Sequence, residues 1–133
     1  CFLIYLTMRK RHQIENTPEV LKTIIQTIQD KKGSDIISLN LKKIHAAVTD
    51  YFVICHAPSR TQVVAIAGHI VDEVSIKCGQ RPYNKEGFEN AEWILIDYVD
   101  VVVHVFLDST RNFYQLERLW ADAEKTVYDD EAK

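Results

Sequence analysis

The pattern of hydrophobic and polar positions predicts helices and strands in the order helix, strand, strand, helix, strand, strand, helix. Apolar residues recur at helical spacing in residues 17–33, 59–79 and 108–123, and they alternate or run together in residues 35–41, 51–55, 93–98 and 101–107. Strands that alternate with helices in this way favour a mixed β-sheet flanked by helices. We therefore expect an α/β fold.

Residues at the predicted helix ends support this assignment. Thr17-Pro18 supplies a capping hydroxyl and then a residue already fixed at a helical φ. Gly33 is a natural stop for the same helix. Ser59 and Gln62 have the spacing of a capping box at the start of the next helix.

The last two predicted strands are separated only by Val99 and Asp100, which favours an antiparallel hairpin. Alternation along the first of these strands puts two sets of side chains on opposite faces, with Trp93, Leu95 and Asp97 on one and Ile94, Ile96 and Tyr98 on the other. If the isoleucines face the helices, the Trp93 face is open to a partner.

The composition is that of one globular domain, because the chain has 133 residues of which 47% are hydrophobic and 26% are charged. We place the domain at residues 17–124, between an N-terminal tail of residues 1–16 and a C-terminal tail of residues 125–133. The net charge of -3 argues against non-specific binding of nucleic acid over the whole surface. The short basic run at residues 9–12 is then a solvated tail, although a local contact with nucleic acid stays open.

The first eight residues are apolar but too short to span a membrane. One hypothesis is that Met8 is the native start. Cys1, Cys55 and Cys78 are odd in number and widely spaced, which is typical of free thiols in a reducing compartment, and we expect a cytoplasmic protein.

The sequence offers little for catalysis. Cys55 and His56 are adjacent, so on a strand their side chains point to opposite faces. The histidines are scattered, without metal-ligand spacing, and no glycine-rich phosphate loop is present. Gly33-Ser34-Asp35 resembles the opening of nucleotidyltransferases, but the strand that follows lacks their pair of acids. We expect no catalytic residue, no metal and no cofactor.

One segment stands out, because residues 86–100 contain acids and aromatic rings but no lysine or arginine. The acids are Glu86, Glu89, Glu92, Asp97 and Asp100, and the rings are Phe88, Trp93 and Tyr98. One interpretation is a solvated acidic loop leading into a core hairpin, with Trp93 and Tyr98 buried. The other is a recognition surface, where rings supply binding energy and carboxylates orient a basic partner.

Several motifs resemble the Iojap-related ribosomal silencing factors. They are, in chain order, Asp30-Lys31-Lys32 with Asp35-Ile36, the strand DYFVI of residues 50–54, Glu86-Gly87, the hairpin of residues 93–106, and residues 111–123 of the last helix. The match covers roughly residues 17–124 with compatible spacing. Val99 departs from a glycine typical of the family's hairpin, and Asn40 from an acid common in its first strand.

The resemblance implies a nucleotidyltransferase-like fold without catalytic carboxylates, in a protein that is not an enzyme. It implies docking on the universal large-subunit protein fourteen of the large ribosomal subunit, which would block joining of the small subunit and repress translation. The implied partner-binding residues are Trp93, Asp97, Tyr98 and Asp100, supported by Glu86 and Phe88. The rings of the last helix, Phe113, Tyr114 and Trp120, and also Leu116, are expected in the core instead.

No membrane and no sequence-specific nucleic acid are expected as partners. Two other functions stay open. The first is a self-associating module, since an exposed apolar hairpin can pair with its own copy and give a homodimer off the ribosome. The second is a nucleotidyltransferase-type enzyme with residual activity.

Overall fold

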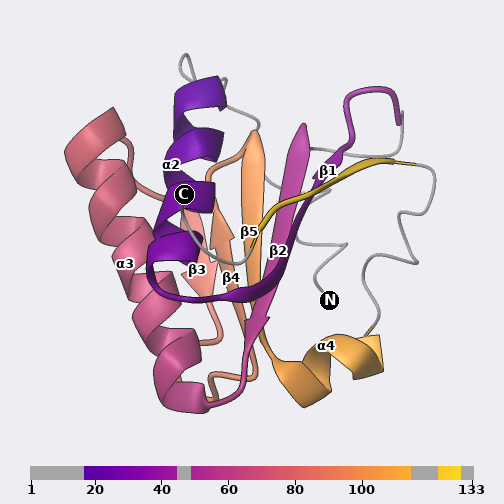
Figure 1. Cartoon of the computed structure of the whole chain (residues 1–133). Coiled ribbons are helices and arrows are strands. Elements are labelled where there is room, and N and C mark those ends of the chain that lie inside the picture. The colour runs from indigo at the N-terminus through magenta and orange to yellow at the C-terminus, as the bar shows by residue number, and fades with distance from the viewer. Residues whose placement is uncertain (1–16, 45–48, 115–122, 130–133) are drawn as a thin grey trace.

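A mixed β-sheet organises the chain (Figure 1). The computed structural model describes residues 17–44, 49–114 and 123–129. Its elements are α2 (Thr17–Asp30), β1 (Ser34–Asn40), β2 (Tyr51–Ala57), α3 (Arg60–Cys78), β3 (Asn84–Glu86), β4 (Trp93–Asp97), β5 (Val101–Leu107), α4 (Asp108–Tyr114) and β6 (Glu124–Val127). Within the described residues the sheet has six strands in the order β3-β4-β5-β2-β1-β6. β2 and β5 are parallel, and the other neighbouring pairs are antiparallel. The predicted mixed sheet with helices is confirmed.

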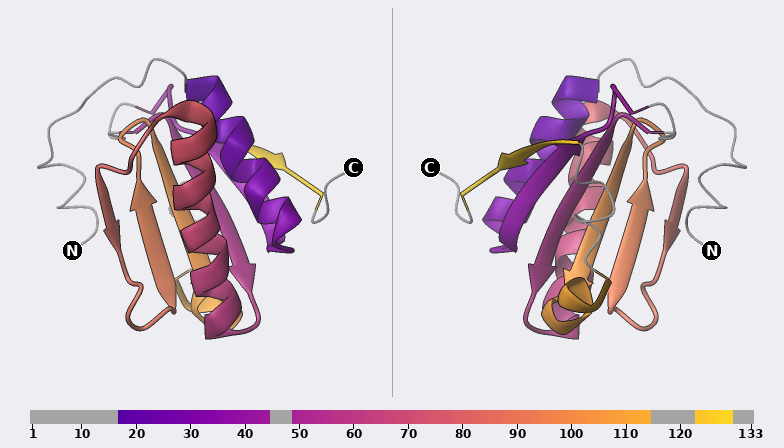
Figure 2. Two further views of the ribbon diagram at one scale, coloured as in Figure 1. Left: turned by 90° about the vertical axis from the view of Figure 1, so that its left-hand side faces the viewer. Right: turned by 90° about the vertical axis from the view of Figure 1, so that its right-hand side faces the viewer.

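Helices α2 and α3 pack side by side on one face of the sheet, and α4 lies near the lower end of the other face (Figure 2). The main core lies under α2 and α3. Its fully buried side chains include Val20, Ile24 and Ile28 of α2, Val63, Ile66 and Ile70 of α3, and Ile94 and Ile96 of β4. Burying a side chain of this size contributes roughly 1.5–3 kcal/mol. The prediction that Ile94 and Ile96 face the helices is therefore confirmed.

The ends of the helices follow the sequence signals, with one difference. The Ser59 hydroxyl accepts a hydrogen bond from the Gln62 backbone N–H at 3.2 Å, as the capping-box spacing predicts. At the end of α2, however, the left-handed residue is Lys32, with φ 62°, and not Gly33. Gly33 donates its N–H to the Ile28 carbonyl at 2.9 Å. A Cβ at Gly33 would overlap the Ile28 side chain, so this glycine is required by close packing.

Two strands were not predicted. β3 has three polar residues, and β6 has four residues that are all exposed. β6 pairs antiparallel with β1, although a C-terminal tail was expected at residues 125–133. The last helix was predicted to reach Ala123, which is wrong for that residue, because Ala123 directly precedes β6 and is not helical.

Several sequence-based expectations lie outside the described residues. They concern the tail of residues 1–16 with its basic run and Met8, and the segment of residues 115–122 with Leu116 and Trp120. The side chains of Phe113 and Tyr114 also lie outside the description. Within the described residues, no helix has the length and apolar character that crossing a membrane requires.

Candidate functional site

The structure separates the predicted partner-binding residues into two groups at opposite ends of β4. Trp93 begins this strand and Asp97 ends it, so the two are about 13 Å apart at about 3.3 Å per residue. Glu86 ends β3, and Phe88 follows in the loop that leads to Trp93. Tyr98 and Asp100 belong to the hairpin turn beyond Asp97. The six residues therefore do not form one continuous surface.

The residues at the hairpin end are buried. Asp97 is 0% exposed, Tyr98 1% and Asp100 2%. The expectation that the Trp93 face is open to a partner is therefore wrong at Asp97, whose side chain makes a hydrogen bond inside the turn. The Asp97 carboxylate accepts a hydrogen bond from the Val99 backbone N–H at 2.7 Å, a geometry for which the short aspartate side chain is suited. The buried Asp97 carboxylate thus stabilises the hairpin turn.

The hairpin turn also explains the departure at position 99. Val99 has φ 75°, in the left-handed region that glycine adopts with least strain. Its N–H is held by Asp97, and the Asp100 carbonyl accepts hydrogen bonds at 3.0 Å from the N–H groups of Asp50 and Tyr51. These bonds tie the turn to the start of β2, so the turn keeps its geometry without the glycine.

At the other end of β4, Trp93 is half-buried in an aromatic cluster. Its indole N–H donates to Nδ1 of His104 at 3.0 Å, and its ring stacks on Phe106 with centroids 5.2 Å apart. Phe52 contacts the His104 ring edge-on at 4.7 Å. Burial lowers the pKa of His104 to about 3, so the imidazole is neutral at pH 7. Trp93 is therefore partly a core residue and partly exposed.

Sequence reasoning missed the role of His104. The hairpin register pairs Trp93 with Phe106 and Leu95 with His104, which places these side chains on one face. His104 lies within a run of valines and diagonal to Trp93 across the hairpin. This arrangement was the signal that could have revealed the hydrogen bond.

The loop between β3 and β4 is held at several points. Gly87 has φ 90°, and its carbonyl accepts a hydrogen bond from Ala91 N–H at 2.9 Å. From the first turn of α3, the Arg60 side chain donates to the Asn90 carbonyl at 3.1 Å and to the Glu92 carboxylate at 2.8 Å. An open cavity of about 670 Å³ lies on this loop and is lined by Lys85, Glu86, Gly87, Phe88, Glu89 and Asn90. The two candidate residues Glu86 and Phe88 both line it.

Gly87 is expected to be essential to this loop. A Cβ at position 87 would overlap the Trp93 carbonyl, and the positive φ adds strain, so we expect Gly87→Ala to lower the free energy of unfolding by about 1–3 kcal/mol. The matched control is Gly68→Ala in α3, where a Cβ meets nothing within 4 Å and helix propensity predicts a gain of up to about 1 kcal/mol. Urea unfolding measures both. Equal effects of the two substitutions would contradict the role given to Gly87.

Phe88 and Trp93 pack against opposite faces of the sheet. Phe88 contacts the core under α2 and α3, whereas Trp93 contacts the cluster on the other face. Both remain partly exposed, and Glu86 and Glu89 are exposed. The edge of the sheet at β3 and the start of β4 therefore presents rings on both sides of an acidic loop.

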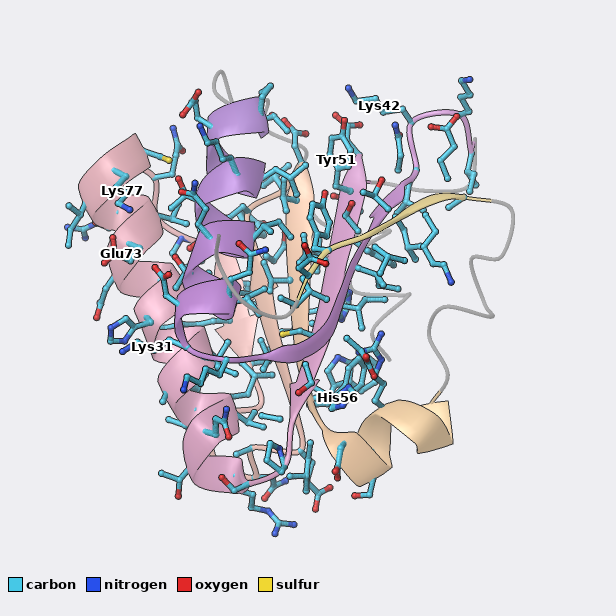
Figure 3. The ribbon with its side chains drawn as sticks, in the orientation of Figure 1. Lys31, Lys42, Tyr51, His56, Glu73 and Lys77 are labelled. Atoms are coloured by element: carbon cyan, nitrogen blue, oxygen red, sulfur yellow. The ribbon has the colours of Figure 1, made fainter. Side chains whose placement is uncertain are left out.

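Cys55 and His56, the pair considered for catalysis, have structural roles. Cys55 is buried under the helices, and burial raises the pKa of its thiol to about 12, which makes it a poor nucleophile. His56 follows on the other face, near α4 (Figure 3), with Nδ1 2.9 Å from Arg111. The predicted divergence of the two side chains is confirmed. Arg111 also donates to the Asp35 carbonyl at 2.7 Å and so joins α4 to the sheet.

Potential metal ligands do not gather in the described part of the chain, where no group of three or more His, Cys, Asp or Glu side chains could hold an ion. Together, the mixed sheet and the acidic, aromatic edge define an α/β protein whose exposed chemistry is suited to binding.

Comparisons with known proteins give the family. The model of the family described as "Ribosomal silencing factor during starvation" matches residues 14–133. The ribosomal silencing factor of Halalkalibacterium halodurans is 44% identical over 105 residues, which are 79% of this chain and 88% of the relative. That of Bacillus subtilis is 44% identical over 108 residues, 81% of this chain and 90% of the relative. A crystal structure of a Chromobacterium violaceum protein is 33% identical, with a TM-score of 0.74 over 87% of this chain and 95% of its own. The chain belongs to the ribosomal silencing factor family, as its motifs implied.

Proposed function

We propose that this chain silences translation by binding the large ribosomal subunit and occluding the face that the small subunit must reach. Membership of the ribosomal silencing factor family supports a ribosome-associated role. To occlude this face, a folded domain only has to stay bound there and exclude the small subunit. It needs no catalytic turnover and no cofactor. The folded core that holds this surface fits such a role.

The observation that carries the proposal is the acidic, aromatic edge of the sheet. Glu86 and Glu89 are exposed, Phe88 and Trp93 are half-buried, and the loop is fixed by Arg60. Rings that are partly exposed and rigidly held are good anchors, and carboxylates around them orient a basic partner. The family resemblance gives the universal large-subunit protein fourteen as that partner, and a basic ribosomal protein suits this surface.

Within this proposal the six candidate residues have different roles. Glu86, Phe88 and Trp93 would contact the partner. Asp97, Tyr98 and Asp100 would act indirectly, because they are buried and shape the hairpin on which Trp93 is carried. A charge reversal at an exposed position is therefore the sharpest test of docking.

The test is a subunit-joining assay on sucrose gradients with purified protein. We expect the unmodified protein to sediment with large subunits and to reduce the peak of joined ribosomes. Glu86→Lys should weaken both effects by roughly tenfold, since a like charge would then face a basic partner. Asp72→Lys, the same change at an exposed position of α3, is the matched control and should act as the unmodified protein does.

Two outcomes would contradict the proposal. If the unmodified protein leaves subunit joining unchanged and does not sediment with large subunits, the proposed function is wrong. If it sediments with them and Glu86→Lys does so equally well, the acidic edge is not the docking surface.

A further inference from the structure

The cavity of the β3–β4 loop already holds a cation of the chain itself. The Lys85 ammonium lies over the Phe88 ring, 5.7 Å from the ring centroid. Glu86 and Glu89 line the same cavity, are exposed, and make no ion pair with another described residue. An aromatic face with two carboxylates beside it attracts a positive side chain by charge and by the ring quadrupole.

The contact with Lys85 is weak enough to be replaced. Lys85 is exposed, so its ammonium stays in contact with solvent while it lies over the ring. Cation–π contacts at exposed sites change an equilibrium by only about two- to fivefold. A guanidinium stacks on a ring with its planar face and is more weakly hydrated than an ammonium, so an arginine would compete well for the same place.

The cavity is present before any partner arrives. Gly87 takes a conformation that leaves no space for a Cβ, and Arg60 fixes the loop through Asn90 and Glu92. A site held in this way loses little conformational entropy on binding, which favours affinity. Its volume of about 670 Å³ is sufficient for one long basic side chain.

Resting on the proposed docking to a basic ribosomal protein, we infer that this cavity receives an arginine or lysine side chain of the partner, and that Lys85 occupies the place until it does. Phe88 is then a specificity-determining residue of the docking surface. Lys85 is an internal competitor that lowers the affinity, because the partner's cation must displace it from the ring.

The experiment is a binding titration of fluorescently labelled protein with purified large subunits. Phe88→Leu keeps an apolar side chain but removes the ring, and we expect the Kd to rise by about three- to fivefold. Lys85→Met keeps the apolar stem and removes the cation, and we expect the Kd to fall by about two- to fivefold. Lys77→Met, the same change at an exposed position of α3, controls for the change in net charge.

The double variant, Lys85→Met with Phe88→Leu, shows whether Lys85 competes with the partner for the Phe88 ring. If Lys85 competes for the ring, the gain from Lys85→Met disappears in the Phe88→Leu background, whereas a gain from net charge alone persists there and equals that of Lys77→Met. Such persistence, or an unchanged Kd for either single variant, overturns the inference. Lys85→Met alters only an exposed side chain, so it tests the inference even if Phe88→Leu does not fold.

Failure of this inference can be told from failure of the proposed function. If the unmodified protein does not bind large subunits at all, both are wrong. If it binds and the variants bind equally well, docking stands and only the role of the cavity is rejected.

Discussion

Lowering the pH from 7 to 4 is expected to reduce the free energy of unfolding by about 3 kcal/mol through His104 alone. Burial lowers the pKa of His104 from 6.5 to about 3 in the folded chain. Between these two values the unfolded chain binds the proton and the folded chain does not, so acid favours unfolding. The stability contributed by this group is complete above about pH 6.5 and is lost as the pH falls toward 3.

Urea unfolding of the unmodified protein and of His104→Gln, at several pH values between 4 and 8, measures this effect. Glutamine offers a carbonyl to the Trp93 indole but does not titrate. The difference in unfolding free energy between the two proteins should therefore change by about 3 kcal/mol across this range, while the carboxylates common to both cancel. His69→Gln, the same change at an exposed position of α3, is the matched control for the substitution itself. A constant difference between the unmodified protein and His104→Gln would contradict the neutral, buried state of His104.

Local patterns were sufficient for the helices with one apolar face and for the strands in which apolar residues run together. Helices α2 and α3 and strands β2, β4 and β5 follow directly from the spacing of apolar residues. The capping box at Ser59 predicted the start of α3. The short edge strands β3 and β6 could not be found in this way. Their residues are polar or exposed, and they are strands only because a neighbouring strand offers hydrogen-bonding groups at its edge.

The residue types of the candidate site were predicted from the sequence, but the burial of their side chains was not. Alternation put Asp97 on the Trp93 face, which is correct, but it could not say whether that face is covered at the Asp97 end. Burial of an acid depends on a partner that only the folded backbone provides, here the Val99 N–H. The glycine-like position at 99, with an aspartate two residues before it, was a signal of such a turn.

Asp97→Lys is expected to prevent stable folding at neutral pH. The substitution removes the acceptor of the Val99 N–H and places an ammonium at a position that is 0% exposed. An uncompensated ammonium in the interior, together with the lost hydrogen bond, costs roughly 3–5 kcal/mol, a large part of the stability of an ordinary domain. Far-UV circular dichroism and urea unfolding of purified protein measure the loss.

Asp97→Asn is the matched variant, since its side-chain oxygen can still accept the Val99 N–H, and it should fold with a loss of no more than about 1–2 kcal/mol. Asp72→Lys, an equal change of charge at an exposed position, should leave the spectrum native. A native spectrum and unaltered unfolding for Asp97→Lys would show that Asp97 is not needed inside the hairpin. If instead the variant unfolds, its failure to bind large subunits reports on the fold and not on docking, which is why the charge of the docking surface has to be reversed at Glu86.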